Sequence, residues 1–273
     1  LESIPGLPDT ATALLRALDD DAGNMDELAS IVNKDAVLSA RLLQIANSAY
    51  YGSLDIATVK QAIVSVFGVN KLKAIALSLL AVRALPVNDT GIDLNGFQRR
   101  ALLTARMTEV LNDALNVGSA ESADIYFAGL LHNIGDLFIA YCRPDEYSAV
   151  FEEAGRAESW SVYLNVQSVR LGINAAECSV FLASYWALPP VLHTLLKSVS
   201  SGTCSDSASQ ILHTAILLAG ADNNEQIETL VTSLIMSLQK TNNQAKSAKN
   251  MQETIISSCS KIIHLLGNDY SVL

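Results

Sequence analysis

The sequence predicts an all-α protein of about a dozen helices. Apolar residues recur at helical spacing along nearly the whole chain; in the first helix they include Ala11, Leu14 and Leu18. No alternating pattern typical of a β-strand extends beyond four residues. Half of the 273 residues are apolar and 17% are charged, so the chain can form a large core and is not expected to be disordered.

Polar caps and glycines divide the N-terminal part into successive helices. The start signals are a cap at Asp9 or Thr10, capping boxes at Asn24 with Glu27 and at Thr58 with Gln61, and Asn70 for the last helix. The stop signals are Gly52, Gly68 and Pro86. A loop is expected over residues 87–96, where Asn, Asp, Thr and Gly cluster.

The remaining elements follow the same logic. A Ser-rich stretch at 198–209 is the expected linker to a helical tail. Helices are predicted over residues 97–115 and 122–141, the second with a bend at Gly135. Further helices are predicted from Pro144, over 161–171, from the capping box of Asn174 and Glu177 to Trp186, and from Pro190. Three more are expected around 211–218, 227–238 and 255–266.

Charge and hydropathy exclude several classes of protein. The formal net charge is −10 and no Lys/Arg-rich run exists, so no nucleic-acid partner is expected. No unbroken apolar stretch approaches the ~20 residues that span a bilayer. The first ten residues lack a basic start followed by an apolar run, so neither a signal peptide nor membrane association is expected.

The cysteines and the missing motifs narrow the chemistry further. The four cysteines, Cys142, Cys178, Cys204 and Cys259, are widely spaced and fit neither a metal knuckle nor a disulfide framework, which indicates thiols in a reducing cytoplasm. The sequence contains no GxGxxG, Walker-type loop, GxSxG elbow or HExxH. No residue has a motif context for nucleophilic catalysis.

The segment 129–136, Gly-Leu-Leu-His-Asn-Ile-Gly-Asp, is the sharpest local signal. A His followed by a carboxylate on a helix is the centre of HD-type metal phosphohydrolases, in which a metal-bound hydroxide attacks phosphorus. Here the second member is Asn133, whose neutral amide is a weak metal ligand. His132 and Asp136 are four residues apart and could share a helical face, but a buried core histidine is the favoured interpretation.

Longer stretches resemble the HDOD domain family over residues 4–199. The run Ile45-Ala46-Asn47-Ser48-Ala49-Tyr50-Tyr51-Gly52 is far longer than a chance match to a two-residue pattern. The matching stretches are Pro5-Gly6-Leu7-Pro8, residues 28–35 (LASIVNKD), 38–52 (LSARLLQIANSAYYG), 59–80, 129–135 and Trp186-Ala187-Leu188-Pro189.

The resemblance implies an HD-like, multi-helix HDOD fold and a role in bacterial signal transduction without catalysis. It also implies a domain plan. Residues 1–199 would form the HDOD domain, with an N-terminal helical part over about 1–90 and an HD-like part over about 91–199. Residues 205–273 would form a helical extension packed on that domain, because the tail is short and closely linked.

The chain departs from the HD metal site at most of its positions. By the resemblance, Arg100 stands where relatives often have a His, and Asn133 replaces the Asp of the His–Asp pair. Further expected ligands fall near Ser198, Val199 and Ile216, and His193, His213 and His264 do not replace them. Of the HD-site positions Arg100, His132, Asn133 and Asp136, only His132 keeps a side chain expected to bind the metal. Since a catalytic metal needs three or more protein ligands, no metal, no cofactor and no catalytic residue is expected.

Four other residues are candidates for a pocket or a partner surface: Asn47, Tyr50, Tyr51 and Arg99. The alternative is that Asn47 and Ser48 end a helix by hydrogen bonding while the tyrosines pack. Arg99 and Arg100 could together bind a phosphate or carboxylate, and the alternative for them is a solvated face or ion pairs.

Three functions stay open at this point. The first is a non-enzymatic regulatory HDOD module that binds a protein partner of a signalling pathway or a small ligand. The second is a metal-dependent phosphohydrolase with an atypical site around His132. The third is a structural scaffold or oligomerisation unit. The sequence identifies neither the partner nor the oligomeric state.

Overall fold

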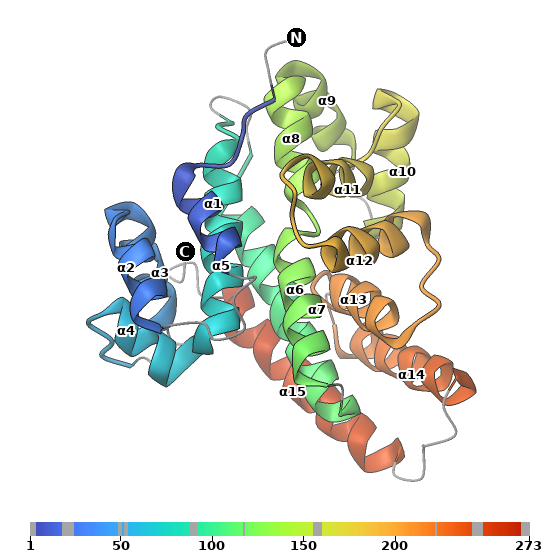
Figure 1. Cartoon of the computed structure of the whole chain (residues 1–273). Helices are drawn as coiled ribbons and strands as arrows, with labels where there is room; N and C mark the ends of the chain where they lie inside the picture. The colour runs from blue at the N-terminus through green and yellow to red at the C-terminus, as the bar shows by residue number, and fades with distance from the viewer. Residues whose placement is uncertain are drawn as a thin grey trace.

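The computed structural model describes residues 4–17, 25–48, 51, 54–87, 92–116, 118–154, 160–221, 223–241 and 248–268. Over these ranges the chain is helical, with α-helices α1 to α15 and one π-helical segment, and it contains no strand there (Figure 1). The prediction of an all-α fold is confirmed.

The N-terminal helices surround a central one. They are α1 (Asp9–Arg16), α2 (Met25–Asn33), α3 (Ala36–Ala46), α4 (Val59–Ala62), the π-helical η2 (Ile63–Phe67) and α5 (Gly68–Ala84). Helices α1, α2 and α3 pack against α5. Helix α5 is apolar around most of its circumference, and residues such as Leu72, Ile75 and Leu80 are fully buried.

The middle of the chain forms a second group of helices beside α5. They are α6 (Leu94–Leu115), α7 (Ser119–Leu131), α8 (Ile134–Cys142), α9 (Pro144–Ala154), α10 (Trp160–Leu171), α11 (Ala175–Tyr185) and α12 (Pro190–Ser201). Helix α7 packs against both α5 and α6, and α8 packs on α11 (Figure 1). This arrangement places the segment 129–136 in the centre of the group.

The C-terminal helices α13 (Ser207–Leu218), α14 (Asn224–Thr241) and α15 (Ala248–Asn268) continue the same core. Both α13 and α15 pack along α6, and α14 packs on α13 and α15. Buried apolar residues such as Ile211, Leu212 and Ile255 join them to the rest of the protein.

Among the caps predicted for described residues, those at Thr58 and Asn174 are confirmed and the one at Asp9 or Thr10 is wrong. The Thr58 hydroxyl accepts a hydrogen bond from the backbone N–H of Gln61, and Asn174 forms a complete capping box with Glu177. The first helix starts at Asp9 without any side-chain cap, because its N-cap position falls on Pro8, which has no side-chain acceptor. Asn24 and Gly52 lie outside the described residues.

The helix around Gly135 differs from its prediction. The break between α7 and α8 falls at His132 and Asn133, and Gly135 lies inside α8. A Cβ at Gly135 would lie 1.9 Å from the Ala175 carbonyl oxygen, so the glycine serves the close approach of α11 and does not bend the helix. Other boundaries also moved: α3 ends at Ala46, α5 begins at Gly68, and the linker shortens to residues 202–206.

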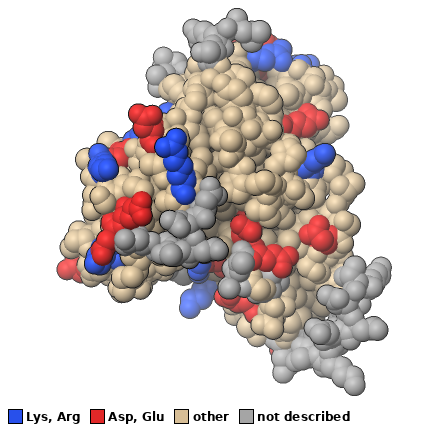
Figure 2. All heavy atoms as spheres, viewed as in Figure 1, with Lys and Arg blue, Asp and Glu red and all other residues tan. Residues whose placement is uncertain are grey.

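Two helical stretches, Val59–Ala84 and Glu121–Cys142, are long and apolar enough to cross a membrane by length and composition. Of their most apolar windows, 50% and 83% are buried inside the protein. Buried core helices pass the same test, so these stretches are weak indications of a membrane span. On the face shown in Figure 2, Lys and Arg side chains are scattered among Asp and Glu and form no continuous basic patch.

Candidate functional site at His132

His132 caps α7 and is buried, with 3% of its surface exposed. Its Nδ1 lies 2.8 Å from the Gly129 carbonyl oxygen, which can only accept, so Nδ1 carries the proton. Burial, aided by the positive charge of Arg100, lowers the pKa of His132 to about 3. The imidazole is therefore neutral, and its Nε2 is an acceptor with no partner among the described residues.

Asn133 follows His132 and is equally buried. Its Nδ2 donates to the Phe97 carbonyl, 3.3 Å away in the first turn of α6. Its Oδ1 has no hydrogen-bond partner within the described part of the chain. The amide thus ties the α7–α8 turn to the start of α6 and leaves one buried acceptor beside His132.

Asp136 lies one helical turn further and is part of a hydrogen-bond network. Its Oδ1 accepts from the Tyr163 hydroxyl at 2.6 Å and from Gln167 Nε2 at 2.9 Å. Gln167 Oε1 in turn accepts from the backbone N–H of Ala175 at 2.8 Å. Burial raises the pKa of Asp136 to about 6, although both donors and Arg100 oppose this. The network joins α8, α10 and α11.

Trp160 packs against His132, and Arg100 packs over Trp160. The guanidinium carbon of Arg100 lies 5.3 Å from the centre of the Trp160 ring, within cation–π range. The Trp160 ring meets the His132 ring edge-on, with centroids 5.7 Å apart, and stacks on Tyr163 at 5.5 Å. Arg100 also reaches the end of α13, where a Cβ at Gly220 would lie 3.2 Å from its Nη2.

The donors around His132 do not fit a divalent metal ion. Within the described ranges, no group of three or more His, Cys, Asp or Glu side chains could hold one. What surrounds His132 is an amide, a guanidinium and an indole, and the guanidinium would repel a cation. Ile216, the position at which the resemblance implies a further ligand, is an apolar residue buried on α13.

The candidate pocket residues of the IANSAYYG run lie elsewhere. Asn47 exchanges two hydrogen bonds with the backbone of Ile56, at 2.9 and 2.7 Å. The Tyr51 ring packs edge-on against Phe67 at 5.1 Å and beneath the guanidinium of Arg106. Tyr50 lies outside the described residues. Arg99 is half-buried on α6. A role for these four residues in a pocket or partner surface stays a prediction.

Two features of the neighbourhood have no counterpart in the sequence-based prediction. Tyr163 and Gln167, which hold Asp136, are 27 and 31 residues away from it and carry no local motif. Glu109, buried on α6, accepts ion pairs from Lys71 and Arg106 and so ties α5 to α6. Of these contacts, only the Arg106–Glu109 pair has a signal in the sequence, its i,i+3 spacing on a helix.

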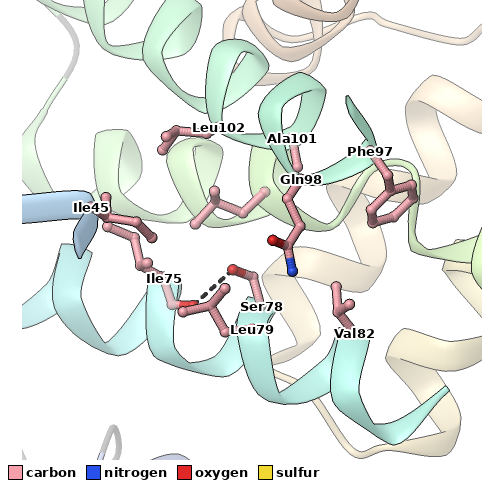
Figure 3. A pocket seen from close by; sticks show the side chains of 10 residues that line it. Ile45, Ile75, Ser78, Leu79, Val82, Phe97, Gln98, Ala101 and Leu102 are labelled. Carbon is pink, nitrogen blue, oxygen red and sulfur yellow. Dashed lines mark hydrogen bonds between the residues drawn. The ribbon is translucent and has the colours of Figure 1, made fainter. Parts of the chain in front are cut away.

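A small cavity lies between α5 and α6 (Figure 3). It has a volume of about 30 Å³, room for about one water molecule. Its walls are mostly apolar, and in Figure 3 the Gln98 amide points toward Ser78, whose hydroxyl donates to the Ile75 carbonyl at 2.8 Å. Such a space fits no larger ligand.

The helices and the His132 motif are characteristic of one family. The family profile of the HDOD domain matches residues 4–201, nearly three quarters of the chain. The chain belongs to the HDOD domain family. The first residues of the matched range, Ile4 and Pro5, lie against the end of α11. Their carbonyls accept hydrogen bonds from Tyr185 and Trp186, each at 3.0 Å.

Solved structures share the HDOD fold over nearly the whole chain. An HDOD domain protein of unknown function from Geobacter sulfurreducens has a TM-score of 0.75 at 18% identity, with 98% of this chain and 94% of that one covered. A candidate phosphohydrolase from Shewanella amazonensis SB2B has a TM-score of 0.74 at 21% identity, with 98% and 93% covered. A candidate signal transduction protein from Marinobacter aquaeolei VT8 has a TM-score of 0.70 at 19% identity, with 97% and 59% covered. At these identities the likeness concerns the fold alone.

A curated relative from Treponema pallidum (strain Nichols), described as uncharacterized, is 27% identical to this HDOD protein over 201 residues. The match covers 71% of this chain but 37% of the relative. This chain therefore spans well under half of the length of that protein.

Proposed function

We propose that this HDOD protein is a bacterial signal-transduction module that acts by binding a protein partner or a small ligand and does not hydrolyse phosphate esters. The observation that carries the proposal is the packing of Trp160 against His132 and of Arg100 over Trp160. The imidazole of His132 thus has as neighbours an indole and a positive guanidinium charge, neither of which binds a metal ion.

The chemistry of the neighbouring groups supports the same function. Hydrolysis by an HD-type site needs a metal ion that lowers the pKa of a bound water, and a metal needs at least three protein ligands. Beside His132 the chain offers the neutral amide of Asn133. The carboxylate of Asp136 is already held by Tyr163 and Gln167. No contact in this neighbourhood favours the alternative of a phosphohydrolase.

We also propose that residues 1–199 and the extension 205–273 work as one unit in the cytoplasm. The packing of α13 and α15 along α6 supports a shared core. All four cysteines are free thiols, which supports a reducing compartment. The net charge of −10 supports a partner other than nucleic acid.

Metal loading of the full chain, followed by a hydrolysis assay, tests the proposed function. The protein is incubated with Mn²⁺, Fe²⁺ or Zn²⁺, dialysed, and analysed for bound metal. Phosphate release is then measured with cyclic dinucleotides and nucleoside monophosphates. We expect metal well below one ion per chain and no turnover above the buffer rate. Stoichiometric metal with turnover that His132→Ala abolishes would overturn the proposal.

A further inference from the structure

Four buried polar atoms around Trp160 have no hydrogen-bond partner among the described residues. They are Arg100 Nε, His132 Nε2, Asn133 Oδ1 and Trp160 Nε1. His132, Asn133 and Trp160 are buried, with 3%, 2% and 8% of their surfaces exposed. Buried polar atoms in proteins are nearly always hydrogen-bonded, so four unpaired ones in one neighbourhood point to a binding site for a polar ligand.

The four atoms come from three elements that meet at Trp160. Trp160 contacts both Arg100 of α6 and His132 of the α7–α8 turn, at 5.3 and 5.7 Å. Asn133 is joined to α6 through the Phe97 carbonyl, one turn before Arg100. The group is therefore a three-sided cluster formed by α6, α10 and the turn.

The chemistry of the cluster defines its complement. Arg100 Nε and Trp160 Nε1 can only donate, whereas His132 Nε2 and Asn133 Oδ1 can only accept, because His132 Nδ1 holds the ring proton. The occupant must therefore offer both an acceptor oxygen and a hydroxyl. The guanidinium of Arg100 forms no ion pair within 4.0 Å in the described part of the chain, although the Asp136 carboxylate is near enough to interact with its charge. A buried positive charge without a contacting partner favours an anion.

The packing of Trp160 limits the size of the occupant. One neighbour of its ring is the Arg100 guanidinium and another is the Tyr163 ring, stacked at an interplanar angle of 21°. A planar aromatic ligand would have to displace one of these two groups before it could stack on Trp160. The occupant is thus a small, compact group and not a nucleobase.

We propose that Arg100, His132, Asn133 and Trp160 bind a small oxyanion that carries a hydroxyl, of which hydrogen phosphate is the simplest. Arg100 and Trp160 donate to its oxygens, and its hydroxyl donates to His132 or Asn133. This inference rests on the proposed function, because it assigns to an anion the place where the HD fold would hold a metal.

Calorimetric titration of the full chain with inorganic phosphate at pH 7.5 tests the assignment. Sulfate at the same ionic strength is the first comparison, since it has no proton at this pH and cannot donate to His132 or Asn133. We expect saturable binding of one phosphate per chain and at least tenfold weaker binding of sulfate. A nucleoside monophosphate is bulkier and mostly unprotonated at this pH, so it should also bind at least tenfold more weakly.

Two variants and a matched control locate the site. Arg100→Gln and Asn133→Leu should each weaken phosphate binding at least tenfold, whereas Arg170→Gln, an exposed arginine on α10 that pairs with Glu153, should leave it unchanged. Absence of phosphate binding to the wild-type protein, equal binding of sulfate or of the monophosphate, or unchanged binding in both site variants would each overturn the assignment. If one variant fails to fold, the anion comparison on the wild-type protein still decides.

Bound metal and phosphate release are measured on the same samples to separate the two proposals. A metal-free, inactive protein that binds no phosphate overturns the oxyanion site and leaves the proposed function standing. A protein that holds one metal ion and turns over phosphate esters overturns both.

Discussion

The guanidinium of Arg100 lies over the ring of Trp160, 5.3 Å from its centre, although the two residues are 60 positions apart in the chain. This contact joins α6 to the first residue of α10 and closes the cluster around His132. It also holds a positive charge near enough to His132 to lower the pKa of its imidazole. The contact therefore bears on both the stability and the chemistry of the site.

Trp160→Ala should lower the free energy of unfolding by about 3–5 kcal/mol, the usual cost of truncating a buried tryptophan. Trp160 is 8% exposed and contacts three side chains that the alanine would abandon. Urea unfolding followed by circular dichroism measures the change. Val169→Ala on the same helix is the control, because Val169 is 74% exposed and its truncation should cost less than about 0.5 kcal/mol. Equal effects of both variants would contradict the packing described for Trp160.

Asp136→Asn should flatten the pH dependence of stability. Burial raises the pKa of Asp136 from 3.8 to about 6, so the folded protein keeps this proton to a higher pH than the unfolded chain. The free energy of unfolding should therefore fall as pH rises from about 4 to about 6, by about 3 kcal/mol at 1.36 kcal/mol for each pH unit. Since the amide does not titrate, the stability of the variant relative to the wild type should rise by about that amount over the same range.

Unfolding curves at half-unit steps from pH 3.5 to 7.5 measure this difference. Asp145→Asn, an exposed carboxylate on α9, is the matched control and should keep the wild-type profile. A constant difference between Asp136→Asn and the wild type across the range would show that Asp136 does not titrate there.

Gly135→Ala should be among the most destabilising single substitutions in the protein. Its Cβ would lie 1.9 Å from the Ala175 carbonyl oxygen and 2.7 Å from Cys178 Cβ, so α8 and α11 would have to separate. We expect a loss of at least about 3 kcal/mol, measured by thermal or urea unfolding. Gly6→Ala, where a Cβ meets nothing within 4 Å, should change stability by less than about 0.5 kcal/mol. A mild effect at Gly135 would mean that the two helices are less closely packed.

The double variant Arg100→His with Asn133→Asp should acquire a metal site. Together with His132 it would present three ligand side chains, the minimum for a protein-bound divalent ion. Titration with Mn²⁺ should show at least tenfold tighter binding than in either single variant, each of which presents two. Tight binding by the wild-type protein, or no gain in the double variant, would contradict the role assigned to Arg100.

Local chemistry made part of the fold predictable. Thr58 and the pair Asn174 and Glu177 were identified as caps because a cap and its partner lie three residues apart in the sequence. Asp9 and Thr10 are not caps because the helix already includes both residues and its N-cap position falls on Pro8. Gly135 was misjudged because its role depends on α11, a helix 40 residues further along the chain.

The site was predictable only to the same extent. His132, Asn133 and Asp136 form a continuous motif, and Arg100 followed from the family resemblance. Tyr163 and Gln167 were missed because their contacts with Asp136 exist only after α8 and α10 have packed. Trp160 was predicted as a core residue, which its burial confirms, but its position over Arg100 depends on the packing of α10 against α6.

The two hydrogen bonds from Tyr185 and Trp186 to the carbonyls of Ile4 and Pro5 each close a loop of 181 residues. During synthesis on the ribosome, the carbonyls of Ile4 and Pro5 would thus leave the exit tunnel long before Tyr185 and Trp186 have been synthesised. At typical elongation rates of about 5–20 residues per second, the segment before α1 would wait roughly 10–35 seconds for α11. Docking of the segment before α1 onto α11 would therefore be a late event of co-translational folding. In nascent chains that stop short of Trp186, this segment should stay undocked.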